Sequence, residues 1–409
     1  MPQSPLKILL LVSSLPAPDD PDIVFRMKNS FILDIMQHVA ADNEVLQPLF
    51  VPCFPGLLKA AYKYKGLEVH FPAVRDEFLG RIKIETIKYL HLPGKYIYRK
   101  SSALHNLLAR QQGKYDLIHC HTAYDLGVVG LAVKEKFSIP LVVSVYGSDV
   151  NWLFETGEKK PDREIIDATT RVLLSADALT CVSRDLAARV AGLGVEKDKI
   201  HWIPNGIERN IFYYGHREKE KEKLGWRRGC KDVLFVGNIY ESKGLGDLVE
   251  AVSIMESDFR DAPEFVIRLA GRPNDYQTGL QDRINNLGLE SRFEFLGLQP
   301  RSAIASMMRA SDLFCLPSWR EGWPCVVIEA LACGCPVVAT DVGGIPEIVT
   351  GDSVGFLSRP RNPQKLAENI SKGLLKEWNR EEIAGTAEPY TYDRLARKVE
   401  EVYREVCGS

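Results

Sequence analysis

Short apolar runs alternate with stretches of helical periodicity along most of the chain. In the first half the apolar runs predict strands at 7–13, 44–51, 116–121, 141–146, 178–182 and 200–203, and the stretches between them predict helices at 31–41, 126–137 and 184–191. Strands that alternate with helices in this way are typical of parallel sheets.

The alternation stops at 205–232 and then restarts. Asn205-Gly206 is a turn signal, and the charged run that follows predicts a solvated linker or a short exposed helix. Beyond it, strands are expected at 233–236, 265–270, 293–296, 313–317 and 337–340, with helices at 245–255, 277–287, 303–310 and 325–332. We therefore expect an α/β chain of two doubly wound halves joined at about 205–215.

Ligands of doubly wound sheets bind outside the carboxyl ends of the strands, and with two domains the cleft between them is the default site. The chain contains neither a P-loop nor a G-x-G-x-x-G motif. Phosphoryl transfer and hydride transfer therefore lack their usual sequence support.

Two glutamates in the segment 317–340 raise a question of charge. Glu321 falls in an expected loop, and Glu329 falls inside an expected helix that otherwise reads as core. A buried carboxylate is costly without a partner. Pro324 is well placed to begin this helix, whose first N–H groups form an anion site, and Lys243 can add a second positive contact.

Carboxylates next to an anion site are repelled by the anion, but they can accept hydrogen bonds from sugar hydroxyls. A ligand that carries both a diphosphate and hydroxyl groups satisfies the whole set, and a nucleotide-sugar is such a ligand. The alternative is that both glutamates are surface residues near arginines, because their spacing alone is common by chance.

Composition agrees with this organisation. A chain of 409 residues favours two domains, and 45% apolar with 26% charged residues describes a soluble globular protein. A net charge of -2 gives no signature of nucleic-acid binding. The nine cysteines are scattered, which is typical of reduced, buried thiols. With no apolar run of membrane-spanning length, we expect a cytoplasmic protein.

Several motifs, in order along the chain, resemble family 4 of the retaining glycosyltransferases. "PSWREGWPCVVIEALACGCPVVATDVGGIPEIV" resembles the signature around the paired glutamates of that family, and "FVGNIYESKGLGDLVEAV" resembles its phosphate-binding strand, loop and helix. "TCVSRDLAARV" with "IHWIPNGIERNIF" is similar to its inter-domain segment, and "YDLIHCHTAYDLG" with "VVSVYGSDV" to its acceptor-side strands. The enzymes of polysaccharide and teichuronic-acid synthesis are the nearest type.

The resemblance implies the GT-B fold, in which two doubly wound, Rossmann-like parallel-sheet domains face a deep cleft. The first domain, on the acceptor side, would be 1–207, and the second, which binds the nucleotide-sugar, would be 208–389. The C-terminal helix at 390–409 would pack back on the first domain.

Carried over by position, the resemblance implies that Glu329 binds the ribose, Glu321 the donor sugar and Lys243 the diphosphate. The implied catalytic residues are Glu321, Lys243, Asp149 and Tyr146. The implied nucleotide-sugar-binding residues are Glu329, Glu321, Lys243, Asn238, Gly271, Arg272, Trp323, Pro324, Cys325, Gly343 and Gly344. The implied acceptor-side residues are His119, His121, Gly147 and Ser148.

The sequence departs from the family pattern at three places. Asn238 stands where the family commonly has an arginine, whose charge Arg272 or Arg320 would have to supply. Tyr146 stands where many members have a histidine, and a tyrosine can donate a hydrogen bond but cannot act as a base at neutral pH. The glycine-rich loop expected after the first strand is absent, since 13–29 carries prolines and acids instead.

No metal and no cofactor are expected. Alternation along a strand puts His119 and His121 on one face and Cys120 on the other, which favours a polar strand end facing the cleft over a zinc site. Asp20-Pro-Asp22 resembles a metal-binding Asp-x-Asp motif, but its proline-rich surroundings favour a turn.

The segment 54–114 carries a net charge of +8 with interleaved aromatic residues. It predicts either the solvated basic face of an insertion or a contact with the anionic headgroups of a membrane. Peripheral attachment to the inner face of the cytoplasmic membrane is therefore left open.

The function expected is that of a retaining, metal-independent, hexosyltransferase-type glycosyltransferase. It would move a sugar from a UDP- or GDP-linked donor to a glycan or lipid-linked acceptor in polysaccharide or cell-envelope biosynthesis, with no nucleic-acid partner. The alternatives are a sugar-nucleotide epimerase or a glycan phosphorylase of the same fold, or a non-catalytic subunit that binds a nucleotide-sugar.

Overall fold

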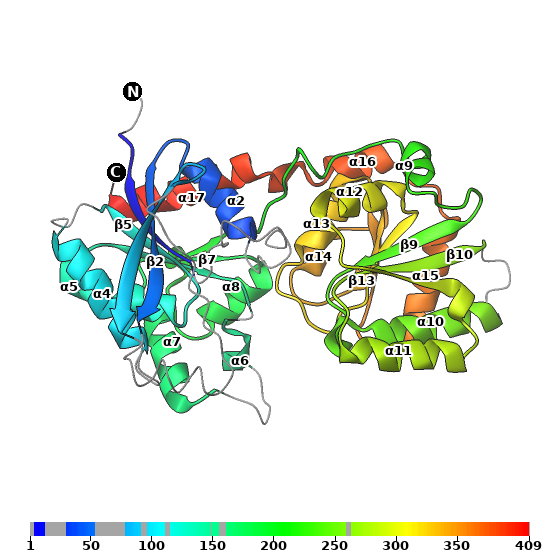
Figure 1. Ribbon diagram of the computed structural model, residues 1–409, viewed down its shortest axis with the longest axis horizontal. Helices are drawn as coiled ribbons and strands as arrows, with labels where there is room; N and C mark the ends of the chain where they lie inside the picture. The colour runs from blue at the N-terminus through cyan, green and yellow to red at the C-terminus, as the bar shows by residue number, and fades with distance from the viewer. Residues whose placement is uncertain are drawn as a thin grey trace. The chain divides into compact units, whose positions relative to one another are not determined.

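The computed structural model describes residues 4–12, 30–53, 78–90, 96–110, 115–147, 149–154, 161–258 and 263–408. The chain forms two compact units, Met1–Ile203 with Leu395–Ser409, and Pro204–Arg394 (Figure 1). The segment 13–29, with its Asp-Pro-Asp, and much of the basic segment 54–114 lie outside the described residues. The membrane contact predicted for that segment and the roles predicted for the two domains stay predictions.

The first unit is built on one sheet with the strand order β3-β4-β2-β1-β5-β6-β7-β8. Its strands are β1 (Lys7–Leu11), β2 (Glu44–Cys53), β3 (Phe78–Leu79), β4 (Ile82–Leu90), β5 (Leu117–His121), β6 (Leu141–Val145), β7 (Ala178–Cys181) and β8 (Ile200–Trp202). All the pairings are parallel except that of β3 with β4. The strand order reverses between β1 and β5, as in doubly wound folds.

The helices of the first unit are α2 (Ser30–Val39), α4 (Tyr96–Arg110), α5 (Leu126–Phe137), α6 (Asn151–Phe154), α7 (Arg163–Ser175) and α8 (Arg184–Ala191), joined by most of α17 (Tyr392–Cys407). Strands β5 and β6 are buried along their whole length, as expected of a parallel sheet covered on both faces. Helix α5 lies close to β5, because a Cβ atom at Gly130 would collide with the Cys120 sulfur.

The second unit is built on a parallel sheet with the order β11-β10-β9-β12-β13-β14. Its strands are β9 (Lys231–Val236), β10 (Phe265–Ala270), β11 (Phe293–Gly297), β12 (Leu313–Leu316), β13 (Val337–Thr340) and β14 (Gly355–Ser358). Its helices are α9 (Arg217–Lys223), α10 (Leu245–Asp258), α11 (Asp275–Asn286), α12 (Arg301–Ala310), α13 (Cys325–Ala332), α14 (Ile345–Ile348), α15 (Pro363–Leu375) and α16 (Arg380–Gly385). Figure 1 shows α12 and α13 on one face of this sheet and α10 and α11 on the other.

The predicted strands and helices are confirmed to within a few residues at their ends. The pattern did not predict the strands β3, β4 and β14 or the helices α4, α6, α7, α14, α15 and α16. None of the helices in the described ranges combines the length and the apolar character that a membrane crossing requires.

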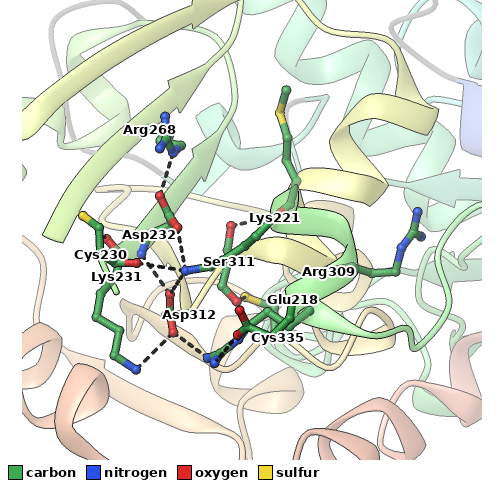
Figure 2. Close-up of polar contacts among 12 residues, drawn as sticks. Glu218, Lys221, Cys230, Lys231, Asp232, Arg268, Arg309, Ser311, Asp312 and Cys335 are labelled. Atoms are coloured by element: carbon green, nitrogen blue, oxygen red, sulfur yellow. Dashed lines mark hydrogen bonds and ion pairs between the residues drawn. The ribbon is translucent and has the colours of Figure 1, made fainter. Parts of the chain in front are cut away.

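The charged run at 205–232 contains the short helix that was one of its two predicted forms, but this helix is not exposed along its whole length. Part of this run forms α9, and the side chain of Lys221 on this helix is only 5% exposed. The Lys221 ammonium lies 2.7 Å from the Asp232 carboxylate and 2.8 Å from the Asp312 carboxylate (Figure 2). Arg268 pairs with Asp232 at 2.8 Å, and Arg217 pairs with Asp312 at 2.6 Å. Helix α9 is therefore anchored by buried ion pairs to the amino ends of β9 and β12.

Candidate active site

The carboxyl edge of the second sheet brings together the first pair of predicted site residues. Lys243 ends the short 3₁₀ helix Glu241–Lys243 that follows β9, and Glu321 lies in the loop that follows β12. The strand order reverses between these two strands, and ligands of doubly wound sheets bind at such a switch point. The Lys243 ammonium donates a hydrogen bond of 2.6 Å to the Glu321 carboxylate, with the two side chains 25% and 12% exposed. The partner that Glu321 required is therefore this lysine.

Close backbone packing holds these two loops together. Gly244 has a φ angle of +67°, and a Cβ atom there would collide with the carbonyl oxygen of Pro317. The Trp319 amide donates to the Ser242 carbonyl at 2.9 Å, and the Trp319 indole N–H donates to the Asp247 carboxylate at 2.7 Å. Only a glycine fits at position 244, so the sequence itself fixes the approach of Lys243 to the loop after β12.

The beginning of α13 is fixed by Trp323 and by the loop after β13. Pro324 is the residue that precedes the helix, and Trp323 before it is buried. The Trp323 indole N–H donates to the Asn205 carbonyl at 3.2 Å. A Cβ atom at Gly343 would collide with the Glu321 carbonyl, and one at Gly344 would collide with the Trp323 ring. The predicted residues Gly343 and Gly344 therefore pack directly against the segment 321–323.

Glu329 lies inside α13, as predicted, with its side chain 13% exposed. A Glu329 carboxylate oxygen lies 3.9 Å from the Arg301 guanidinium at the start of α12. Burial, followed by the nearby charge of Glu329, raises the pKa of the Cys325 thiol to about 12. Cys325 is thus a neutral, inert thiol beside a carboxylate that has an arginine as its neighbour.

The carboxyl ends of β9, β10 and β11 approach one another at the same edge of the sheet as Lys243. The Gly271 amide donates to the Gly297 carbonyl at 2.8 Å, and a Cβ atom at Gly271 would collide with the Gly237 carbonyl. Asn238 follows Gly237 directly, and Arg272 follows Gly271. The structure therefore brings Asn238, Gly271 and Arg272 to one edge of the sheet.

The predicted acceptor-side histidines lie at the carboxyl end of β5 in the first unit. His119 and His121 are both buried, with their ring centroids 4.1 Å apart, and Cys120 points the other way, toward α5. Their predicted position on one face of the strand is confirmed. The His119 ring nitrogens lie 2.6 Å from the Tyr403 hydroxyl and 2.7 Å from the Ser144 hydroxyl.

Burial keeps both histidines neutral. It lowers the pKa of His119 to about 3, and burial together with the nearby His119 lowers the pKa of His121 well below its usual value. Within the described ranges, no three histidine, cysteine or acidic side chains lie close enough together to hold a metal ion.

The half-buried Asp149 carboxylate accepts hydrogen bonds from backbone N–H groups. One oxygen accepts from the amides of Tyr146 and Gly147, each at 3.0 Å, and the other accepts from the Ala123 amide at 3.2 Å. Burial raises the pKa of Asp149, and these N–H groups act in the opposite direction. Asp149 therefore ties the turn after β6 to the turn after β5. The predicted residue Ser148 lies outside the described residues.

Comparison with known proteins decides the family. A model described as "Glycosyl transferases group 1" matches residues 216–400, and one described as "Glycosyltransferase Family 4" matches residues 59–210. An uncharacterized glycosyltransferase of Methanocaldococcus jannaschii is 30% identical over 307 residues, which cover 71% of this chain and 75% of that protein. The chain belongs to glycosyltransferase family 4.

A second sequence relative and a solved structure are also similar to this family 4 chain. The putative teichuronic acid biosynthesis glycosyltransferase TuaC of Bacillus subtilis is 29% identical over 380 residues, covering 90% of this chain and 89% of TuaC. The HepE protein of Anabaena, solved in complex with UDP, superposes with a TM-score of 0.72 at 22% identity, covering 97% of this chain and 99% of HepE. The expected GT-B fold and the expected enzyme class, a retaining glycosyltransferase, are confirmed.

Sequence reasoning missed several residues that shape the sites of this family 4 enzyme. Asn205 accepts a hydrogen bond from Trp323, and Tyr403 forms a hydrogen bond with His119. Arg301 lies within ion-pair distance of Glu329. Each stands far along the chain from its partner, and Tyr403 reads as an ordinary apolar position of an amphipathic helix. The sequence did predict a turn at Asn205-Gly206, but it did not predict the hydrogen bond between Asn205 and Trp323.

Proposed function

We propose that this enzyme transfers a sugar from a nucleotide diphosphate sugar to a glycan or lipid-linked acceptor, with retention of configuration and without a metal ion. The observation that carries the proposal is the hydrogen bond of 2.6 Å between Lys243 and Glu321 at the switch point of the second sheet. This pair offers one group for a phosphate and one for a sugar hydroxyl within reach of the same ligand.

Binding of the donor would exchange the partners within this pair. The diphosphate takes the Lys243 ammonium, and the Glu321 carboxylate turns to accept hydrogen bonds from the donor sugar. Charge-assisted hydrogen bonds of both kinds are about twice as strong as neutral ones. The first N–H groups of α13 lie at the positive end of the helix and would bind a second phosphate oxygen.

Glu329 would hold the ribose from the middle of α13, and Arg301 would offset its charge while the site is empty. Asn238, Gly271 and Arg272 would line the nucleotide, with Arg272 or Arg320 supplying the charge that Asn238 lacks. Gly343 and Gly344 would lie close to the donor, because they pack directly against the segment 321–323, where an added Cβ atom would collide.

During the reaction, the bond between the anomeric carbon and the diphosphate oxygen breaks, and a bond from that carbon to the acceptor oxygen forms on the same face of the sugar. The acceptor proton passes to the departing diphosphate. Lys243 would stabilise the charge that develops on this leaving group. His119, His121, Gly147 and Ser148 would belong to the acceptor side, where Asp149 and Tyr146 shape the turn.

The likeness to TuaC supports an acceptor in polysaccharide or cell-envelope synthesis, and the UDP in HepE supports a uridine-linked donor. A cytoplasmic location, with 54–114 against an anionic membrane surface, belongs to the same proposal.

The test is incubation of the purified protein with labelled UDP-, GDP- and ADP-sugars. Slow hydrolysis of one donor to the sugar of the same anomeric configuration is expected, at a rate that Lys365→Met on the exposed face of α15 leaves unchanged. A new epimer of the donor would indicate an epimerase instead. Binding without turnover, even with candidate acceptors present, would indicate a non-catalytic subunit.

A further inference from the structure

The His121 ring is partnered at one nitrogen and not at the other. Its Nδ1 atom lies 2.5 Å from the Tyr146 hydroxyl oxygen, and the two rings are nearly parallel, with an interplanar angle of 16°. Its Nε2 atom is buried and has no hydrogen-bond partner within the described part of the chain. His119, in contrast, has a partner at both ring nitrogens. The difference singles out His121 as the histidine with an unused polar group.

Tyr146 is held rigidly where it meets His121. The residue directly follows β6, and its amide donates to the Asp149 carboxylate at 3.0 Å. Gly147, the next residue, has a φ angle of +102° that other residues rarely adopt, so the turn requires this glycine. The other oxygen of Asp149 binds the Ala123 amide beyond β5. The two strand ends are therefore tied together around the hydrogen bond between Tyr146 and His121.

The direction of this hydrogen bond follows from the neutrality of His121. A neutral imidazole has one N–H donor and one acceptor nitrogen. A phenol O–H is a stronger donor than an imidazole N–H, and the unprotonated ring nitrogen is a stronger acceptor than a phenol oxygen. Tyr146 therefore donates to Nδ1, and the proton of the ring lies on Nε2.

We propose that Tyr146 is a positioning residue that fixes His121 in the Nε2–H form, so that this buried N–H donates to an oxygen of the bound sugar substrate. The ligand class follows from the donor, because a neutral N–H in a buried setting suits a sugar hydroxyl or ring oxygen and provides no charge for a phosphate. The substrate part of this inference rests on the proposed function. The tautomer part rests on the geometry alone.

The tautomer can be read without substrate. Of the eight histidines in the chain, His121 is assigned in long-range ¹H–¹⁵N spectra of ¹⁵N-histidine protein as the signal missing from His121→Gln. The expected pattern near neutral pH is that of a ring protonated at Nε2. An Nδ1–H pattern for the assigned signal in the wild-type protein overturns the proposal, whatever the activity of any variant.

Variants of Tyr146 then connect the tautomer to activity. Tyr146→Phe should turn the His121 signal into that of a tautomer mixture and lower kcat about tenfold, the effect of one lost positioning hydrogen bond. Tyr146→His again places a hydrogen-bond donor at this position. It should restore part of the Nε2–H signal of His121 and part of the lost kcat. The matched control is Tyr213→Phe at an exposed tyrosine in the other unit, which should change neither.

An unchanged kcat in Tyr146→Phe, with the His121 tautomer altered, would overturn the substrate role of the Nε2–H group. An unaltered tautomer in that variant would overturn the positioning role. If no nucleotide-sugar is turned over by the wild type while the tautomer responds to Tyr146→Phe, the proposed function fails and the positioning role of Tyr146 stands.

Discussion

The Lys243 ammonium lies 2.6 Å from the Glu321 carboxylate, although the two residues follow different strands and stand 78 positions apart in the chain. Their loops are held together by the hydrogen bond from the Trp319 amide to the Ser242 carbonyl and by the close approach of Gly244 to Pro317. The packing of the two loops therefore holds the pair together. In the proposed function, a donor would exchange the partners of these two charges, which the fold has already positioned.

Lys243→Met should reduce kcat for donor hydrolysis or transfer by about 10²–10³-fold, the loss typical of a group that stabilises charge only in the transition state. Initial rates at saturating donor measure the effect, and Lys365→Met controls for the loss of a lysine. A kcat in Lys243→Met equal to that of the wild type would remove the lysine from the leaving-group site.

Lys221→Met should destabilise the second unit by about 3–5 kcal/mol, because it leaves the buried Asp232 and Asp312 carboxylates without their shared cation. Chemical unfolding measures this loss. Lys219→Met, at an exposed position on the same helix, should be close to neutral. Equal stabilities of the two variants would contradict the buried ion pairs drawn in Figure 2.

The stability of the first unit should fall with acid because of His119. Its folded pKa of about 3 lies below the ordinary value of 6.5, so between these values the unfolded chain binds a proton that the folded chain does not. Stability therefore decreases as pH falls below about 6.5, by about 1.4 kcal/mol for this residue between pH 7.5 and 5.5. Unfolding experiments at both pH values should show a smaller decrease in His119→Gln than in the wild type, and the same decrease in both would count against a neutral, buried His119.

Chelation should leave activity intact, because Lys243 and the start of α13 provide the positive charge that a metal ion supplies in other transferases. Donor hydrolysis is compared before and after dialysis against EDTA. Loss of activity that manganese or magnesium restores would contradict the metal-free mechanism.

The sequence predicted the two wound halves well, because their strands are continuous apolar runs bounded by turn residues. It also predicted that Lys243 and Glu321 follow strands and that Glu329 lies inside a helix. It was wrong about Lys221, since a lysine in a charged run reads as solvated. Its two carboxylate partners stand before or at the starts of β9 and β12, and only the fold brings them to α9.

Side-chain networks across distant elements were likewise beyond the sequence. His119 and Tyr403 are bonded at a separation of 284 positions. Alternation along β5 placed both histidines on one face, yet nothing in the local pattern distinguishes the fully partnered His119 from His121, whose Nε2 atom lacks a partner within the described residues. That distinction depends on where α17 and the turn at Tyr146 lie.

The central claim is that the nucleotide of the donor binds at α13 with Glu329 on its ribose. Calorimetric titration of UDP and GDP into the wild type, Glu329→Ala and Glu250→Ala tests it most directly, since Glu250 is an exposed glutamate on α10. We predict that Glu250→Ala binds the preferred diphosphate as the wild type does, and that folded Glu329→Ala binds it about 10–100-fold more weakly through the loss of charged hydrogen bonds. Wild-type affinity in a folded Glu329→Ala protein would contradict the claim.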